Sequence, residues 1–536
     1  MRAPALQVTA ARPGRLAPKW KVLIAVIFGI FMVLLDTTVV NVAFQTLRTE
    51  YGASLNDAQW IISIYVLMLG ISTPLAGFLA ERLGIKQTYL IGLGIFIVGS
   101  LLCGIAQNLP FLIAARALQA FGGGLAQPLG IALLLRTFPP AEQGTALGIF
   151  GIAVLVAPAL GPILGGFLVD QGMWRAIFFL NPPIGLLGIF LGLRFLPNIK
   201  TDHRPQLDIW GLITEIIGFG SVLYAASIAA NVGWTAPDVL MWFGVGVVGL
   251  IAFVIVELFI AKEPLLDLRL FAKRIFLNAS LLGYVSVIAL FGAEFLMPIY
   301  LQALRGLTAL ETGLILLPLA VSGTIATIVA GKLYDKVGPR LLASFGFVVL
   351  VVNTWQLSQL KADTPIGWIA FLLTLRGVAL GATVQTTLVT ALSVVPLKQL
   401  AHGSALTNAT RQVVQAIGIA VLATVLASTL SPQVSALQQQ FLNVAPQPGV
   451  RPIALCNPAS NTTAAGTATI GTMQLPPNAI QLMGEACQES VAGFEQAYAV
   501  TFYAAIVALV LALMLPGWPL KWAGRRAADM PTSIAH

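Results

Sequence analysis

Long apolar runs separated by short polar gaps dominate the chain, and fourteen of them are long enough to cross a bilayer as helices. The strict alternation typical of barrel strands is absent from these runs, and hydrocarbon offers no partner to free backbone groups. The chain is therefore predicted to be an all-α polytopic membrane protein. The first run extends from about Lys21 to Phe44, and the others centre near Leu67, Phe96, Gly122, Leu155, Leu187, Gly218, Val248, Ile288, Ile325, Phe347, Leu375, Ala420 and Val507.

Composition agrees with this assignment, because 57% of the 536 residues are hydrophobic and only 10% are charged. Soluble domains carry about a quarter charged residues. The formal net charge of +9 comes from Lys and Arg in the short gaps, without the basic stripe and interleaved aromatics of a nucleic-acid-binding surface. These features predict a lipid bilayer as the main partner and exclude nucleic acid.

The distribution of Lys and Arg predicts the orientation of the helices. The gaps after odd-numbered helices hold only Arg48, Arg175, Arg305, Lys361 and Arg451. We therefore expect both termini to be cytoplasmic, in a multi-pass protein of the inner (cytoplasmic) membrane. The N-terminal tail and the remaining gaps hold many more basic residues, among them Lys19, Lys21, Arg82, Lys86, Arg136, Lys200, Arg204, Lys262, Lys273, Arg274, Lys336, Arg340, Lys398, Arg525 and Arg526.

The helices divide into two sets of six with an additional pair between them. The predicted segments are a cytoplasmic tail (1–20), an N-terminal six-helix bundle (21–196), an inserted two-helix hairpin (209–260), a C-terminal six-helix bundle (275–520) that includes a long external loop (431–497), and a second cytoplasmic tail (521–536).

Two cytoplasmic gaps repeat one motif, G-x-L-x-acid-base-x-G-x-base, between the second and third helices of each half. The first glycine permits close helix packing, and the second permits a tight turn. The acid can cap a helix or pair with a base of the other half, which predicts a gate at the cytoplasmic mouth. The alternative is a hairpin that only fixes orientation. The gate residues are Gly77, Glu81, Arg82, Gly84 and Lys86 in one copy and Gly331, Asp335, Lys336, Gly338 and Arg340 in the other.

The external loop contains two cysteines, Cys456 and Cys487. On the oxidising side of the membrane they could form a disulfide. Two free thiols are the alternative, and the sequence does not separate the two.

Several segments carry a resemblance to a known family. They are the two repeated motifs, Leu35–Ala43, Gln59-Trp60 with Tyr65, Arg116 with Gln119 and Gly122, Gly161–Gly166, and Trp174–Gly185. On these residues the chain resembles the major facilitator superfamily, and within it the fourteen-helix EmrB/QacA-type drug:proton antiporters. The resemblance implies a major facilitator fold whose fifth helix seals antiporters against leak. The residues of that helix are Pro158, Gly161, Pro162, Gly165 and Gly166, and the two prolines are expected to bend it.

Charged residues inside the predicted spans are candidates for function, because each costs several kcal/mol in lipid unless paired or hydrated. Asp36 lies fifteen residues beyond Lys21, or roughly 22 Å along its helix. Arg116 lies six residues, or about 9 Å, beyond Pro110 at the opposite surface. In a core about 30 Å thick these depths coincide, so we expect Asp36 and Arg116 to pair and to couple protons to substrate. Two separate structural charges are the alternative.

Other charges within the spans have more than one candidate role. Glu294 occupies the ninth helix, which the repeat relates to the first, and is a candidate second proton or cation site, or else an interfacial residue. Arg376 and Arg411 are its candidate charge partners. Glu257 is expected to snorkel to the cytoplasmic surface, and Glu215 is expected to be structural.

A proton-coupled antiporter that exports drugs or other amphipathic or cationic small molecules is the favoured function. The chain lacks a Gly-rich phosphate loop followed by Lys-Ser/Thr, so a proton gradient, without any cofactor, is the expected energy source. Its three histidines are too scattered to predict a metal site. A proton-coupled exporter of one metabolite, lipid or siderophore is the main alternative; an embedded enzyme or a sensor is less favoured. A periplasmic adaptor is a conceivable partner.

Overall fold

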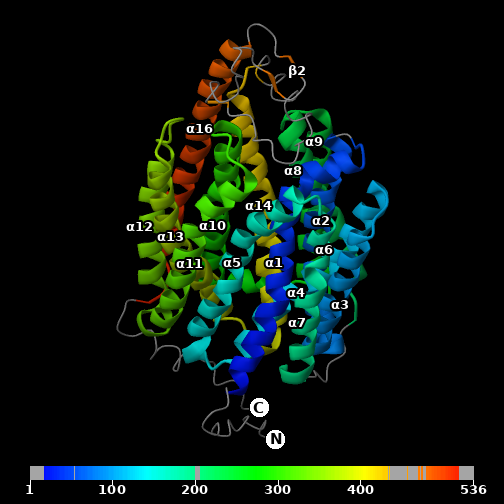
Figure 1. The fold of residues 1–536 in the computed structure, drawn as a ribbon. Coiled ribbons are helices and arrows are strands. Elements are labelled where there is room, and N and C mark those ends of the chain that lie inside the picture. The colour runs from blue at the N-terminus through cyan, green and yellow to red at the C-terminus, as the bar shows by residue number, and fades with distance from the viewer. Residues whose placement is uncertain are drawn as a thin grey trace, which may run out of the picture.

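The computed structural model describes residues 17–53, 55–198, 206–431, 434, 455–456, 469–470, 473–474 and 479–517. Within these ranges thirteen helices are long and apolar enough to cross a membrane. The helix α10 (Arg274–Ile299) completes a set of fourteen. Figure 1 shows them as one elongated bundle. The first helix begins and the last helix finishes at the same end of this bundle.

The N-terminal half contains six long helices and two short ones. Asn108 caps α4 by accepting a hydrogen bond from the Phe111 backbone at 2.9 Å. Pro74, Pro128, Pro158 and Pro162 lie inside helices, which is tolerated where neighbouring helices pack closely. The elements are α1 (Pro18–Glu50), α2 (Leu55–Leu83), α3 (Ile85–Gly104), α4 (Leu109–Thr137), η1 (Pro140–Glu142), α5 (Gln143–Asp170), α6 (Ala176–Phe179) and α7 (Asn181–Phe195).

The inserted pair consists of α8 (Ile209–Val232) and α9 (Pro237–Ile255), which continues as η2 (Val256–Ile260). Asp208 caps α8 by accepting a hydrogen bond from the Gly211 backbone at 2.9 Å. The pair contacts both halves. Ser227 on α8 accepts a hydrogen bond from Gln59 on α2, and Trp234 donates one to Thr424 on α14.

The C-terminal half repeats the six-helix arrangement. A capping box starts α11, in which Thr308 and Glu311 satisfy each other's backbone N–H groups. The elements are η3 (Leu268–Ala272), α10, η4 (Tyr300–Leu304), α11 (Ala309–Val337), α12 (Pro339–Leu357), α13 (Ile366–Leu392), η5 (Leu397–Gln399), α14 (Leu400–Ser428), β1 (Thr469–Ile470), β2 (Met473–Gln474) and α16 (Ala479–Leu513). The two short strands pair antiparallel.

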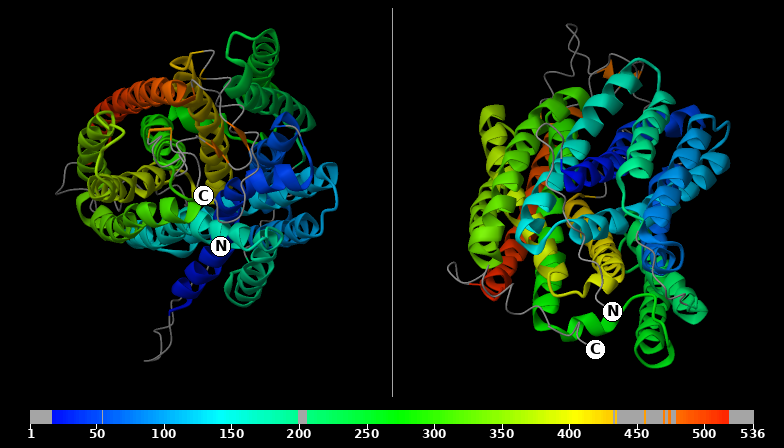
Figure 2. Two further views of the ribbon diagram at one scale, coloured as in Figure 1. Left: turned by 45° about the horizontal axis from the view of Figure 1, so that its top comes forward. Right: turned by 90° about the horizontal axis from the view of Figure 1, so that it is seen from below.

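The two halves meet along two helix pairs, α5 with α11 and α2 with α14. In Figure 2 the N-terminal half (blue to cyan) lies beside the C-terminal half (light green to red), and the inserted pair lies at the periphery. We call the end of the bundle at which α1 begins and α16 ends the terminal face. The other end is the opposite face.

The last helix begins earlier than the sequence predicted. The external loop was expected to extend to residue 497, but α16 already begins at Ala479. The missed segment is amphipathic rather than uniformly apolar. Met483, Ala486, Ser490 and Phe494 are buried at helical spacing while polar residues lie between them. At 35 residues α16 measures about 52 Å, so its first turns extend beyond a hydrocarbon core about 30 Å thick.

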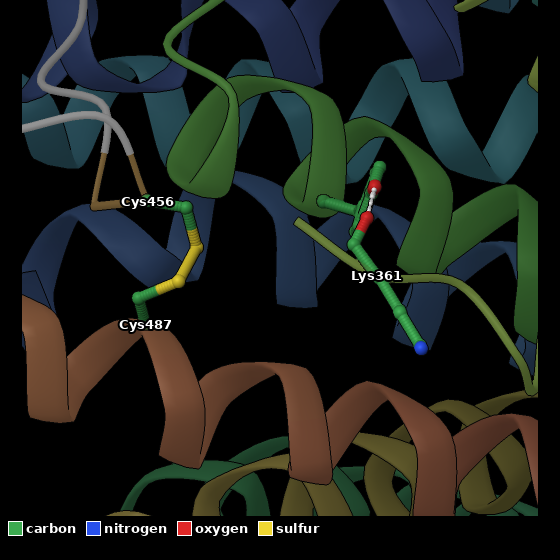
Figure 3. The surroundings of a disulfide bond; sticks show 4 residues. Lys361, Cys456 and Cys487 are labelled. Atoms are coloured by element: carbon green, nitrogen blue, oxygen red, sulfur yellow. Dashed lines mark hydrogen bonds between the residues drawn. A yellow bond between two sulfur atoms is a disulfide. The ribbon is translucent and has the colours of Figure 1, made fainter. Parts of the chain in front are cut away.

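A disulfide between Cys456 and Cys487 joins the loop to α16 at the opposite face, which decides between the two alternatives left by the sequence (Figure 3). The backbone of Leu455 and Cys456 donates hydrogen bonds to Ala303 and Leu304 at the end of α10 and η4. The same region is held by Tyr300, whose hydroxyl donates to the Lys361 carbonyl at 2.6 Å. These contacts connect α16 to α10 outside the expected hydrocarbon region.

Candidate functional site

Asp36 on α1 and Arg116 on α4 form an ion pair in the interior of the N-terminal half. Arg116 Nη1 lies 2.5 Å from Asp36 Oδ2. The other carboxylate oxygen, Oδ1, accepts from Gln119 Nε2 at 2.8 Å and from Asn181 Nδ2 at 2.7 Å. Gln119 Oε1 in turn accepts from Arg116 Nη1 at 2.7 Å. The carboxylate is therefore held by three side chains from two other helices.

The network is sealed from solvent on every side. Asp36 is 1% exposed and Arg116 is 2% exposed. The Arg116 guanidinium carbon lies 4.0 Å from the centroid of the Tyr65 ring, and Nε donates to the Ile61 carbonyl. Removing one member of a buried ion pair leaves an uncompensated charge, which costs about 3–5 kcal/mol. Loss of either charge alone is therefore expected to destabilise the folded protein.

The depth estimate from the sequence correctly brought Asp36 and Arg116 together, but it did not identify the amides that complete the network. Gln119 lies three residues after Arg116 on the same helix face, and this spacing is a signal that could have found it. Asn181 starts α7 and also donates to Ser100 on α3 at 2.9 Å. Only the packing of α7 against α1 and α3 reveals its role.

The corresponding positions of the C-terminal half are arranged differently. The side chain of Glu294, on α10, lies outside the described residues. Arg376 is fully buried, and it donates from Nη2 to the Ala289 carbonyl at 2.7 Å and from Nη1 to Asn353 Oδ1 at 3.3 Å. This arginine therefore faces α10 and α12, in the way that Arg116 faces α1.

A small cavity lies between α10, α13 and α14, and Arg411 lines it together with Tyr284 and Asn408. Its volume is about 50 Å³. Ligand pockets usually measure about 300–1,000 Å³, so this cavity is too small for a drug-sized molecule.

Asp335 connects the two halves at the terminal face. Its carboxylate accepts from the backbone N–H groups of Gly144 and Thr145, each at 3.1 Å, and from Thr145 Oγ1 at 3.0 Å. These are the first residues of α5, where the helix dipole favours negative charge. Gly331, one turn earlier, packs on Gly144 so closely that a Cβ at residue 331 would overlap the Gly144 carbonyl.

The other copy of the motif makes the equivalent contact with α14. Glu81 Oε1 lies 3.1 Å from His402 Nε2, in the first turn of that helix. A Cβ on Gly77 would lie 2.9 Å from His402 Nδ1, so the glycine makes room for the ring. The ring's Nδ1 faces the Leu265 carbonyl at 2.9 Å. His402 is not among the candidate residues predicted from the sequence.

The remaining motif residues lie within the turns themselves. Gly84 and Gly338 adopt φ values of 95° and 84°, which favour glycine. Lys86 Nζ donates to the Leu193 and Leu196 carbonyls at the end of α7, at 2.8 and 3.0 Å. Arg82 lies over the Phe78 ring, whereas Lys336 lies in the last turn of α11 and Arg340 in the first turn of α12.

The glycines of the fifth-helix motif bring α5 against α1. A Cβ on Gly161 would overlap the Thr38 hydroxyl, and one on Gly165 would lie 3.1 Å from the Val39 carbonyl. Gly166 is also buried, and Pro158 and Pro162 lie inside the helix. On its other side α5 packs along α11. The motif therefore places α5 between α1 and the opposite half.

Glu257 does not snorkel, contrary to the expectation from the sequence. It is 1% exposed, and its Oε2 accepts from the Leu266 backbone at 3.4 Å. The segment after η2 folds back over the carboxylate and covers it, which the distance from the helix end did not reveal. Glu215 is fully buried as well.

Comparisons with known proteins agree with this architecture. The Major Facilitator Superfamily model matches residues 26–419. An uncharacterized MFS-type transporter, YhcA of Bacillus subtilis (strain 168), is 38% identical over 403 residues, which are 75% of this chain and 76% of YhcA. The multidrug export protein EmrB of Escherichia coli (strain K12) is 32% identical over 403 residues, 75% of this chain and 79% of EmrB.

The fold is shared with a solved structure of far lower sequence identity. The MFS proton:xylose symporter XylE, bound to 6-bromo-6-deoxy-D-glucose, superposes with a TM-score of 0.58 at 14% identity, over 93% of this chain and 96% of XylE. The family model covers well over half of the chain. The chain belongs to the major facilitator superfamily, in its EmrB/QacA-type branch of membrane transporters.

Proposed function

We propose that this transporter is a proton-coupled antiporter that exports amphipathic or cationic small molecules, including drugs, by alternating access. Its energy source is the proton gradient, without a cofactor. The observation that carries the proposal is the buried Asp36–Arg116 pair, whose carboxylate is held by Arg116, Gln119 and Asn181. The 32% identity with the multidrug export protein EmrB supports the substrate class.

Protonation of Asp36 changes the stability of the whole network. A neutral carboxyl no longer balances the guanidinium of Arg116, which is then a buried charge without its counter-ion, at a cost of several kcal/mol. Such a cost favours any arrangement in which water reaches Arg116. Asp36 is only 1% exposed in this conformation, so proton exchange takes place in another state of the cycle.

The terminal face is the cytoplasmic side in this proposal. The excess of Lys and Arg in its loops supports that orientation. Both repeated motifs hold the halves together there, through Asp335 on α5 and Glu81 with His402 on α14. The described arrangement then has a closed cytoplasmic mouth, and both contacts separate when the substrate enters from the cytoplasm or the inner leaflet.

A second site in the C-terminal half completes the cycle. Glu294 on α10 is proposed to bind a proton or a cationic substrate, with Arg411 on α14 as a candidate charge partner. One net charge that crosses a potential of 100 mV supplies about 2.3 kcal/mol, which is enough for useful accumulation of substrate.

Efflux from proteoliposomes tests the proposal. A cationic dye is loaded, a pH gradient is imposed, and export by the Asp36→Asn variant is compared with that of the unmodified protein. The expected result is loss of pH-driven export, because Asn cannot exchange a proton. Asp238→Asn, an exposed acid on α9, is the matched control and keeps export. Normal dye export by Asp36→Asn with unchanged pH dependence would refute the proposed role of Asp36.

A further inference from the structure

Acidic side chains gather at the end of the inserted pair that lies at the terminal face. Glu215 on α8 is fully buried, and Glu257 on η2 is 1% exposed. Both carboxyl oxygens of Glu215 and Oε1 of Glu257 have no hydrogen-bond partner among the described residues. The Oδ2 atom of Asp208 also has no hydrogen-bond partner among the described residues. Four buried oxygens therefore lack partners in one small region.

The carboxyl groups of Glu215 and Glu257 lie on the same side of α8. A Cβ added to Gly211 would lie 2.9 Å from Glu257 Oε1, so this carboxyl covers the glycine. Glu215 follows Gly211 by four residues and projects from the same face one turn later. The element η2, which carries Glu257, packs directly on α8. The two carboxyls therefore form a pair.

Among the described residues, no basic side chain forms an ion pair with Glu215 or Glu257. The elements packed on it present Asp208 on α8, Asp267 before η3, and Glu81 with His402 at the ends of α2 and α14. Arg269 turns away to the Leu258 carbonyl, and no ion pair of Glu215, Glu257 or Asp208 occurs in the part of the chain that the structure describes. A buried carboxylate that has no counter-charge and at least one oxygen without a hydrogen bond takes up a proton instead.

One peptide group connects the pair to the contact between the halves. The Leu266 N–H donates to Glu257 Oε2, and the carbonyl of the same peptide, on Leu265, accepts from His402 Nδ1 at 2.9 Å. His402 Nε2 then faces Glu81 Oε1 at 3.1 Å. Because both ring nitrogens face acceptors, this contact also holds a proton, on the ring or on Glu81.

We propose that Glu215 and Glu257 form a proton-binding site on the inserted helix pair, which is coupled to the closure of the terminal face through the Leu265–Leu266 peptide. With a proton bound, the pair stays packed and Glu257 holds the peptide against His402. Without it, negative charge accumulates where nothing balances it, the segment after η2 is released, and the α2–α14 contact loosens. This site is separate from Asp36, and the proposal does not require Asp36 to exchange protons.

Infrared difference spectroscopy of the full chain in nanodiscs tests proton binding. A titration from acid to alkaline pH is expected to show loss of a protonated carboxyl band. That band is absent or shifted in Glu215→Gln and in Glu257→Gln, and it is unchanged in the control Asp238→Asn. A band that persists in the double variant Glu215→Gln/Glu257→Gln would show that other groups carry the proton and would overturn the proposal. Glutamine keeps the shape of each side chain without its charge, so these variants are expected to remain folded, which size-exclusion chromatography checks.

A distance measurement tests the coupling. Spin labels at Leu83→Cys on α2 and Leu397→Cys on η5, both exposed, report the separation across the terminal face. Alkaline pH is expected to lengthen this distance in the parent, whereas the double Gln variant keeps the short distance. His402→Gln is expected to retain the carboxyl band and to lose the coupled movement. A double Gln variant that opens like the parent, or opening that follows sodium concentration at constant pH, would contradict the proposal.

These readouts separate the two proposals. Asp36→Asn is expected to stop pH-driven export while the carboxyl band of the inserted pair and the pH-dependent distance persist. Loss of both in Asp36→Asn would assign the proton site to Asp36 and overturn the present inference.

Discussion

Glu81 on α2 and His402 on α14 face each other at 3.1 Å, Oε1 to Nε2, although they belong to opposite halves of the transporter. The contact mirrors that of Asp335 with the first residues of α5. In both cases the acid of a repeated motif lies at the N-terminal end of a helix from the other half, where the helix dipole stabilises negative charge. The repeat in the sequence is therefore also a repeat of contacts between the halves.

Glu81→Ala is expected to shift the terminal face toward the open state. A hydrogen bond to a charged group contributes about 1.5–3 kcal/mol, so the open fraction should rise by tenfold or more. Reaction of a cysteine at Leu83 with a membrane-impermeant maleimide in inside-out vesicles measures the change. Glu142→Ala is the matched control, because Glu142 pairs with Lys19 within the N-terminal half. Equal labelling of the two variants would argue against a gate.

Thr145→Val tests the other contact with little change of shape. It removes the hydroxyl that donates to Asp335 at 3.0 Å and leaves both backbone donors in place. The expected loss is about 1 kcal/mol, which corresponds to a severalfold rise in the open fraction. Distance measurements between labels on α5 and α11 would detect this rise in the open fraction. Asp335→Ala, which removes all three acceptor contacts, should have a larger effect, and the reverse order would contradict this assignment.

The Asp36–Arg116 pair is expected to show strong coupling in a double-mutant cycle. Arg116→Gln leaves the buried carboxylate unbalanced and should lower stability by about 3–5 kcal/mol. The double variant Asp36→Asn/Arg116→Gln should recover much of this loss, while pH-driven export remains absent. Thermal unfolding in detergent measures the stabilities, and dye efflux measures transport. Additive losses in the double variant would show that the two side chains act independently.

The sequence predicted some of these relationships and missed others for identifiable reasons. The depths of Asp36 and Arg116 followed from counting residues along helices of constant rise, and the structure places the two side chains in contact. His402 and Asn181 escaped notice because their partners belong to distant segments, which only tertiary packing brings together.

Glu257 shows the limit of reasoning from one helix. Its position near a helix end predicted snorkelling, but the segment around Leu266 folds back over it. The predicted end of the external loop was wrong for a related reason. Hydropathy marks the part of α16 in lipid, whereas its first turns are amphipathic and pack on protein.

Reduction of the Cys456–Cys487 disulfide is expected to destabilise the transporter without abolishing transport. The bond closes a loop with a sequence separation of 31, and a disulfide of this kind contributes about 2–4 kcal/mol. It lies at the opposite face, away from the Asp36 network and from both motifs. Cys456→Ser/Cys487→Ser should therefore melt at a lower temperature than the parent and still export dye. Cys103→Ala, which removes the buried free cysteine, is the control for loss of a thiol. Equal melting temperatures with and without the bond would contradict the expectation.

Gly331→Ala is expected to separate α5 from α11 at the terminal face. The added Cβ would overlap the Gly144 carbonyl, which is backbone and cannot rotate away, so the helices must move apart. Overpacking of this kind costs about 1–3 kcal/mol, and it acts only while the halves are in contact. The variant should therefore favour the open terminal face, with faster labelling of a cysteine at Leu83 and slower net export.

The control for this substitution is Gly94→Ala on α3, where an added Cβ meets no atom within 4 Å. That variant should label and export like the parent, because alanine favours helix and nothing has to move. If Gly331→Ala also behaved like the parent, the close approach of α11 to α5 would have no part in holding the halves together. The contact of Asp335 with Thr145 would then be the one that holds α11 against α5 at the terminal face.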